Sequence, residues 1–156
     1  MADFDHLPYR PCAGLILLND ENKVFVAKRI DMPSDAWQMP QGGIDEGEDA
    51  EQAAMRELEE EIGTNKARII SRYPTTLLYD LPDELKGKIC GGRYRAQEMH
   101  WFLLRYEGTE QDINLETEHP EFSDYQWVQM EQLPDLAISF KRDVYQQLVD
   151  HFITTL

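Results

Sequence analysis

Cysteine is scarce in this chain: it has two, Cys12 and Cys90, far apart in a sequence of 156 residues. Neither has a second cysteine or a histidine beside it at metal-ligand spacing. The sequence therefore supports neither a disulfide framework nor a zinc site, and we expect free, buried thiols.

Basic residues are also few. Fifteen Lys and Arg stand against thirty Asp and Glu, which gives a net charge of -15 and a pI near 4.5. Affinity for a nucleic-acid backbone is mostly cationic, so this composition excludes a protein that coats nucleic acid along an extended groove. Any polyphosphate has to be bound locally, and we expect most of the remaining acids to serve solubility.

Long apolar runs are missing as well. No run approaches the ~20 residues that a bilayer span needs, and residues 1–5 lack the basic and apolar pattern of a signal peptide. Repeats, low-complexity tracts and Pro/Gly linkers are likewise absent from the sequence. We expect one domain over residues 1–156, in the cytoplasm and with no membrane partner.

What the sequence does contain is a dense acidic motif. Residues 42–48 (GGIDEGE) are followed, after seven residues, by residues 56–63 (RELEEEIG). Helical neighbours lie three and four positions apart, so Glu57, Glu60 and Glu61 should project from one side of a helix. Hard cations between the carboxylates would relieve their repulsion, and Mg²⁺ is the usual choice in phosphate chemistry. The motif suggests a metal-phosphate site.

The helix has its own start and stop signals. Asp49 is a good N-cap, Gln52 completes a capping-box spacing, and Gly63 fits the end, which predicts a helix over 50–62. A second stripe of apolar side chains should pack on the core: Met55, Leu58 and Ile62.

A pair of glutamates on a helix is usually a solvated face, but this pair belongs to a longer pattern. The spacing is Gly, five residues, Glu, seven residues, then Arg-Glu-aliphatic-any-Glu-Glu-any-Gly. It resembles the Nudix box, the signature of hydrolases that act on a nucleoside diphosphate linked to a further group. Thr64 stands where the pattern has a bulky aliphatic residue, a departure that concerns packing at the helix end. The acids around Asp45 lack the alternating ligand pattern of an EF-hand calcium loop.

Other segments predict the rest of the fold. Apolar runs over 12–18 and 24–29, bridged by polar residues 19–22, predict a β-hairpin. Further strands are expected over 68–81, 99–106 and 124–130, with a polar loop over 82–95 and a terminal helix over 140–152. These strands with two helices predict an α/β sandwich, and the Nudix resemblance implies an α/β/α sandwich with a mixed sheet.

Outside the box, four segments are similar to the bacterial branch of the Nudix family that includes RNA 5′ pyrophosphohydrolases and dinucleoside polyphosphate hydrolases. They are residues 9–11, 37–43, 120–122 and 140–142. The resemblance covers about residue 9 to residue 152. Tyr79 is a feature of the dinucleoside polyphosphate type, whereas Ala36 replaces a hydroxyl residue of some relatives, so one phosphate or ribose contact is not expected.

The resemblance implies roles for individual residues. Mg²⁺, with Mn²⁺ as a possible substitute, would be held by Glu48, Glu57, Glu60 and Glu61. The catalytic residues would be Glu57, Glu121 and Arg56, with Glu48 as the favoured bidentate partner of Arg56. Glu57 and Glu121 are both candidates for the general base, because a base needs hydrogen-bond reach to the water. Substrate-binding roles are implied for Arg10, Arg29, Trp37, Tyr79, Phe140 and Lys141.

Within the substrate-binding set, Arg10, Arg29 and Lys141 match positions that grip the phosphate chain, and Phe140 matches a base-stacking platform. Structural alternatives stay open for three of these side chains. Arg29 also fits an ordinary charged residue at a strand edge. Phe140 also fits the core-facing side of the terminal helix, and Trp37 also fits a structural position in the scaffold.

Two functional classes follow. One is a hydrolase that cuts a phosphoanhydride, either at a triphosphorylated RNA 5′ end or in a dinucleoside polyphosphate such as diadenosine tetraphosphate. The other is a nucleotide-binding regulator on the same scaffold without turnover. The complete acid set favours the hydrolase, because a regulator has no evident need for four acids that raise the cost of the apo state. The physiological substrate, the number of metal ions, the oligomeric state and protein partners are not readable from the sequence.

Overall fold

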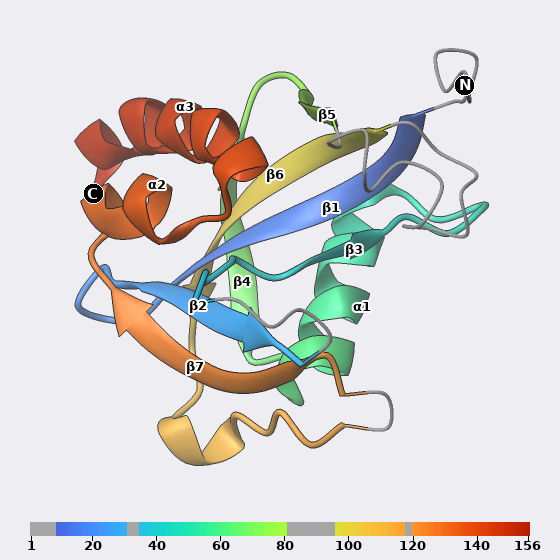
Figure 1. The fold of residues 1–156 in the computed structure, drawn as a ribbon. Helices are drawn as coiled ribbons and strands as arrows, with labels where there is room; N and C mark the ends of the chain where they lie inside the picture. The colour runs from blue at the N-terminus through green and yellow to red at the C-terminus, as the bar shows by residue number, and fades with distance from the viewer. Residues whose placement is uncertain (1–8, 31–34, 81–95, 118–119) are drawn as a thin grey trace.

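A computed structural model describes residues 9–30, 35–80, 96–117 and 120–156 of the chain (Figure 1). In this part of the chain, seven strands form one mixed sheet with the order β4-β6-β1-β2-β7, while β3 pairs with β1 and β5 with β6. The strands are β1 (Tyr9–Leu18), β2 (Val24–Arg29), β3 (Gln41–Gly43), β4 (Ala67–Arg72), β5 (Leu77–Asp80), β6 (Ala96–Tyr106) and β7 (Phe122–Val128).

Helices cover both faces of this sheet (Figure 1). They are α1 (Ala50–Ile62), α2 (Leu133–Leu136) and α3 (Arg142–Phe152), with 3₁₀ turns η2 (Glu110–Asp112), η3 (Met130–Gln132), η4 (Ser139–Lys141) and η5 (Ile153–Thr155). Helix α1 packs on one face, and α2 and α3 pack on the other. The expected α/β/α sandwich with a mixed sheet is confirmed.

Strand β1 shows why both faces are covered. Every residue of its 12–18 stretch is buried, and alternate side chains enter different cores. Cys12, Ile16 and Leu18 join the core beneath α3; Ala13, Leu15 and Leu17 join the core beneath α1. A strand buried on both faces reads as a continuous apolar run, as this one does. It runs parallel to β6 and antiparallel to β2 and β3.

Two predicted local structures are confirmed. The hairpin joins β1 to β2 with Leu18 opposite Val24. Helix α1 has the predicted bounds, with Asp49 and Gln52 forming a reciprocal capping box. It ends at Gly63, which adopts a left-handed φ of 83° that favours glycine.

The single strand expected over 68–81 is wrong, because β4 ends at Arg72 and β5 begins at Leu77. Both strands pair with β6, where Arg72 lies opposite Phe102 and Leu77 opposite Met99. Four residues between β4 and β5 therefore face two residues of β6. Pro74, one of the four, has no N–H to donate to the ladder.

Other boundaries move by a few residues. Strand β6 starts before the expected 99, β7 spans 122–128 in place of 124–130, and α3 begins two residues later than expected because η4 takes its first turn. Strand β3 and helix α2 were not predicted; both are too short for a periodic signal. The loop expected over 82–95, with Cys90, lies outside the described residues. Within the described residues, no helix is long and apolar enough to cross a membrane.

Candidate active site

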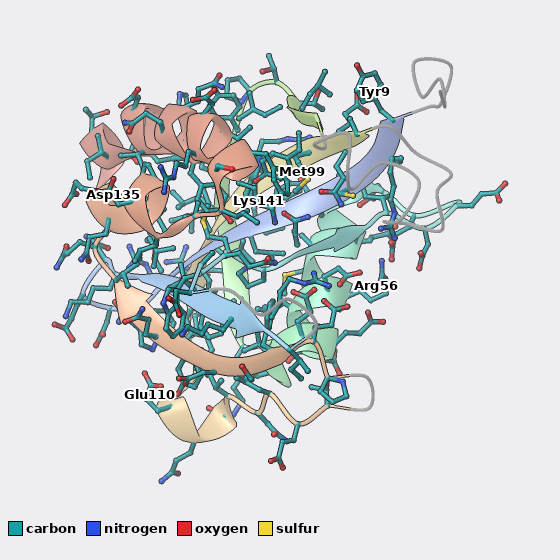
Figure 2. The ribbon with its side chains drawn as sticks, viewed as in Figure 1. Tyr9, Arg56, Met99, Glu110, Asp135 and Lys141 are labelled. Carbon is teal, nitrogen blue, oxygen red and sulfur yellow. The ribbon has the colours of Figure 1, made fainter. Side chains whose placement is uncertain are left out.

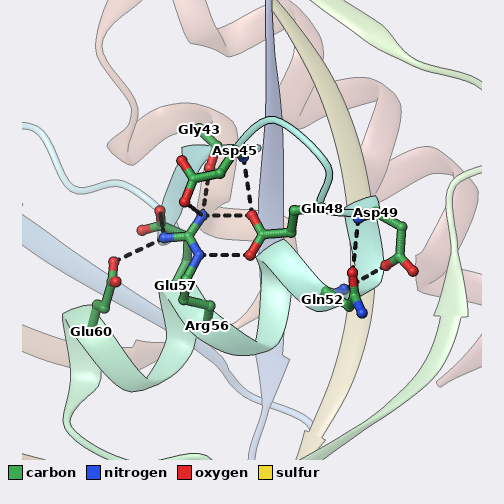
Figure 3. A network of polar contacts seen from close by, with 8 residues as sticks. All are labelled: Gly43, Asp45, Glu48, Asp49, Gln52, Arg56, Glu57 and Glu60. Atoms are coloured by element: carbon green, nitrogen blue, oxygen red, sulfur yellow. Dashed lines mark hydrogen bonds and ion pairs between the residues drawn. The ribbon is translucent and has the colours of Figure 1, made fainter.

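Arg56 is the centre of a polar network on α1 (Figure 3). Its Nε donates to Glu48 Oε2 at 2.8 Å and its Nη2 to Glu48 Oε1 at 2.9 Å, so the predicted bidentate contact is confirmed. Nη2 also donates to the carbonyl of Gly43 at 2.8 Å. Nη1 donates to Glu57 at 2.9 Å and to Glu60 at 3.0 Å. One guanidinium therefore donates hydrogen bonds to three acids of the motif and forms an ion pair with a fourth, Asp45, at 3.5 Å.

Glu48 is bound at both oxygens. Oε1 accepts a second hydrogen bond from the backbone N–H of Asp45 at 3.1 Å. The hydrogen bonds from Arg56 and then from Asp45 lower the pKa of Glu48 to about 2. This geometry suits a carboxylate that fixes Arg56, and the role of Glu48 as a cation ligand stays a prediction.

The two glycines of β3 make room for functional side chains. A Cβ on Gly42 would collide with the Glu57 carboxylate, and a Cβ on Gly43 would collide with the Arg10 guanidinium. Strand β3 lies antiparallel to the start of β1, which carries Arg10. The glycines of the motif are therefore needed for the close approach of two charged groups to the backbone.

A pocket of about 530 Å³ opens beside the acidic face of α1. Its lining residues are Arg56, Glu57, Glu59, Glu60, Glu61, Thr117 and Glu121. Glu121 comes from the segment before β7, which is tied to the end of β2 because Ile30 N–H donates to the Glu121 carbonyl at 2.9 Å. The pocket thus unites the predicted acids Glu57, Glu60, Glu61 and Glu121. Sequence reasoning missed Thr117, for which the motif carries no signal.

Two acids in this pocket are held in unusual states. Glu61 is 3% exposed, and neither of its carboxylate oxygens has a hydrogen-bond partner among the described residues. Burial, and then the neighbouring carboxyls of Glu121 and Glu57, hold the pKa of Glu61 well above its usual range. Burial also raises the pKa of Glu57 to about 7, against the hydrogen bond from Arg56.

This donor set fits a hard divalent cation. Buried carboxylate oxygens without a donor are costly, and an oxygen-liganded cation would satisfy them. Among the described residues, no three acidic, histidine or cysteine side chains already converge as a metal cage. Arg56 Nη1 instead bonds both Glu57 and Glu60, so these carboxylates would have to turn towards a cation.

Lys141 forms a second, buried part of the site. Figure 2 shows Lys141 beside the first turn of α3 and Arg56 on α1. Lys141 is 5% exposed, and its Nζ donates to Gln38 Oε1 at 3.4 Å and to Gln41 Oε1 at 3.3 Å. The same Nζ lies 5.4 Å from the ring centre of Tyr79 and 5.9 Å from that of Phe140. Amide oxygens and aromatic faces therefore hold the ammonium.

The charge state of Lys141 is set by its surroundings. Burial and then the charge of Arg29 lower the pKa of Lys141 to about 7, while Glu61 acts in the opposite direction. The structure thus places the predicted phosphate-gripping residues Arg29 and Lys141 within electrostatic reach of each other and of the acidic helix. An anion beside Lys141 would favour its charged form.

The other predicted binding residues are placed differently. Tyr79 is fully buried with Lys141 Nζ 5.4 Å from its ring centre, so it packs against the lysine here, and its contact with substrate stays a prediction. Phe140 is half-buried and packs edge-on against Tyr79 with ring centres 6.1 Å apart, which joins it to the core, while its base-stacking role stays a prediction. Trp37 is also half-buried, with Lys28 Nζ 5.0 Å from its ring centre.

A mixed sheet between two helical layers, with a glutamate-rich helix lining a pocket, defines the Nudix class of hydrolases. The NUDIX domain model matches residues 8–148, and the chain belongs to this family. It is an enzyme that acts on phosphoanhydride bonds, in a family that uses divalent metal ions. The regulator without turnover is therefore not retained.

Relatives of similar length support this membership. An RNA pyrophosphohydrolase of Sphingopyxis alaskensis is 52% identical over 154 residues, covering 97% of this chain and 98% of the relative. One of Erythrobacter litoralis is 54% identical over 155 residues, covering 97% and 94%.

Solved structures agree with the fold. A dihydroneopterin triphosphate pyrophosphohydrolase of E. coli superimposes with a TM-score of 0.68 at 24% identity, covering 92% of this chain and 98% of the other. An Ap4A hydrolase of C. elegans gives a TM-score of 0.65 at 20% identity, covering 93% and 99%. At this level of identity the likeness concerns the fold alone.

Proposed function

We propose that this enzyme removes pyrophosphate from triphosphorylated RNA 5′ ends, and cleaves dinucleoside polyphosphates such as diadenosine tetraphosphate, with Mg²⁺ as its cation. Two RNA pyrophosphohydrolases, 52% and 54% identical to this chain, support RNA as the substrate, because the match covers nearly the whole length of each. The observation that carries the chemistry is the pocket that joins Glu57, Glu60, Glu61 and Glu121, with the buried Lys141 within electrostatic reach of Glu61.

The cation would be held by Glu57, Glu60 and Glu61, with Glu121 as a further oxygen donor. When bound, Mg²⁺ neutralises phosphate charge and lowers the pKa of a coordinated water. Mn²⁺ should substitute, whereas zinc should not, because the ligand set contains carboxylates and no thiol or imidazole.

The chain's own residues then have distinct tasks. Arg10, Arg29 and Lys141 neutralise the phosphate chain, and Arg56 keeps the Glu57 carboxylate oriented. A carboxylate takes a proton from the attacking water while the water oxygen bonds to phosphorus. The bridging P–O bond breaks, and the leaving phosphate group keeps the electron pair. Glu57 and Glu121 both line the pocket and both stay candidates for this base.

Product analysis tests the proposal. RNA labelled in its 5′ triphosphate and diadenosine tetraphosphate are incubated separately with the enzyme in Mg²⁺, in Zn²⁺ and in EDTA after extensive chelation. We expect 5′-monophosphorylated RNA and a mononucleotide product in Mg²⁺, and neither in EDTA. Robust turnover in EDTA would contradict the metal assignment, and an enzyme that leaves both substrates intact would overturn the proposed function.

A further inference from the structure

Thr117, a lining residue of the acidic pocket, carries a hydroxyl without a hydrogen-bond partner among the described residues. Its side chain lines the pocket together with the acids of α1, and its Oγ is buried with no hydrogen-bond partner among the described residues. Buried hydroxyls normally have a partner in the protein or in ordered water. The hydroxyl thus has no partner among these residues to give up, and a turn about the Cα–Cβ bond of Thr117 would present it to a molecule in the pocket.

The fold fixes the position of Thr117. The segment that leads to it is anchored at the end of α1, where Asn114 N–H donates to the carbonyl of Ile62 at 2.7 Å. Ile113 and Leu115 on the same segment pack against the core beneath α1. These contacts hold the segment against the end of α1 just before Thr117 joins the lining of the acidic pocket.

The chemistry of this hydroxyl differs from that of its neighbours. The other lining residues are five glutamates and Arg56. With a cation bound, the glutamates are ionised and only accept hydrogen bonds, and Arg56 already donates from Nε, Nη1 and Nη2 to carboxylates. A threonine hydroxyl accepts and donates at once. Among the described lining residues, Thr117 is thus the group able to link a water molecule to a carboxylate through a free O–H.

We propose that Thr117 positions the attacking water. Its Oγ accepts a hydrogen bond from one O–H of the water, and its own O–H donates a hydrogen bond to a neighbouring carboxylate. The second water proton passes to the carboxylate base while the water oxygen bonds to phosphorus and the bridging P–O bond breaks. Thr117 neither gains nor loses a proton over the reaction. This inference rests on the proposed function, because it requires attack by water in this pocket.

Two substitutions separate the hydroxyl from the methyl group. Thr117→Val keeps the shape and loses the hydroxyl, whereas Thr117→Ser keeps the hydroxyl and loses the methyl. We expect Thr117→Val to lower kcat by ~10–100-fold with KM within about twofold, and Thr117→Ser to stay within about threefold of the wild type. The loss in Thr117→Val should be the same on 5′-triphosphate RNA and on diadenosine tetraphosphate, because the water is common to both reactions.

Binding of Mn²⁺ alone, followed by electron paramagnetic resonance, should be unchanged in both variants. Normal turnover in Thr117→Val, or equal losses in Val and Ser, would overturn the inference, as would a loss of Mn²⁺ affinity that matches the loss of turnover. If Thr117→Val melts early, Thr117→Ala removes the same hydroxyl with less demand on packing. Inactivity of the wild type on both substrates would overturn the proposed function instead, so the two failures are distinguishable.

Discussion

The ammonium group of Lys141 lies 5.4 Å from the ring centre of Tyr79, in a position where the lysine is 5% exposed. A buried amine next to an aromatic face and near Arg29 is destabilising until an anion arrives, because burial disfavours its charge. This relationship predicts that Lys141 lowers the stability of the substrate-free protein and favours the binding of an anion.

Replacing Lys141 with Met should therefore stabilise the substrate-free protein and impair the enzyme. We expect a melting temperature higher by at least ~2 °C, as a gain of about 1 kcal/mol would give at this size. The value of kcat/KM should fall by at least ~10-fold, because a charge-assisted contact to phosphate is lost. Thermal melts and kinetics check both effects, with Lys23→Met in the hairpin as the control. An unchanged kcat/KM would remove Lys141 from the site.

The pH dependence should follow the same lysine. The pKa of Lys141 is 10.5 in the unfolded chain and about 7 in the folded protein. The lysine therefore contributes stability above pH 10.5, and this contribution is lost as pH falls towards 7. Without substrate, this contribution should therefore raise the melting temperature of the wild type between pH 7 and pH 10.5, and the Lys141→Met variant should lack the rise. Substrate binding runs the other way: KM should increase as pH rises above 7, because the protonated form grips phosphate. The charged groups that face Lys141, Arg29 and Glu61, remain in both proteins. Parallel pH profiles of the two proteins would contradict this prediction.

Loss of an acid from α1 should stop the reaction without unfolding the protein. We expect Glu57→Gln or Glu60→Gln to lower kcat by at least ~100-fold, because the cation or the base is no longer positioned. Removing one charge from a crowded set relieves repulsion, so the melting temperature without metal should not drop. Glu59 lines the pocket and is a poor control, whereas Glu51 in the first turn is exposed and suits this purpose. Near-normal rates would count against the assignment.

Arg56→Lys should show that the fork geometry matters. A lysine keeps the charge but cannot make two parallel hydrogen bonds to Glu48 while also bonding Glu57. We expect a fall in kcat of ~10-fold or more together with a lower melting temperature. Glu48→Gln measured in parallel should reproduce part of both effects, because it weakens the same pair. A lysine variant with wild-type kinetics would show that charge alone suffices.

Recognition of RNA should be confined to the first few nucleotides. A net charge of -15 gives little long-range attraction for further phosphates. Phe140→Ala should raise KM more than it lowers kcat, because stacking holds ground state and transition state alike. Kinetics on unstructured 5′-triphosphate RNAs of increasing length check both points. Affinity that keeps growing past several nucleotides would reveal an extended groove, and unchanged kinetics in the variant would leave Phe140 to its place against Tyr79.

Features that depend on near neighbours along the chain were predictable from the order of residues. Helix α1, its Asp49 cap and its Gly63 end follow from residues three or four positions apart, where helical geometry is fixed. The Arg56 fork to Glu48 spans eight positions, from the helix to the loop before it, and was predicted because both residues belong to one short motif. The Nudix resemblance supplied the mixed-sheet fold and the downstream acid Glu121.

The neighbours of these elements in space depend on how distant segments of the chain pack. The segment that carries Thr117 is joined to the end of the acidic helix by the backbone hydrogen bond from Asn114 to Ile62. This is a contact between distant segments, which no periodic pattern encodes. The burial of Tyr79, and with it the altered pKa of Lys141, depends on how α3 packs over β5 and β1. Local geometry follows from the order of residues, whereas burial and charge coupling arise only when separate segments exclude water together.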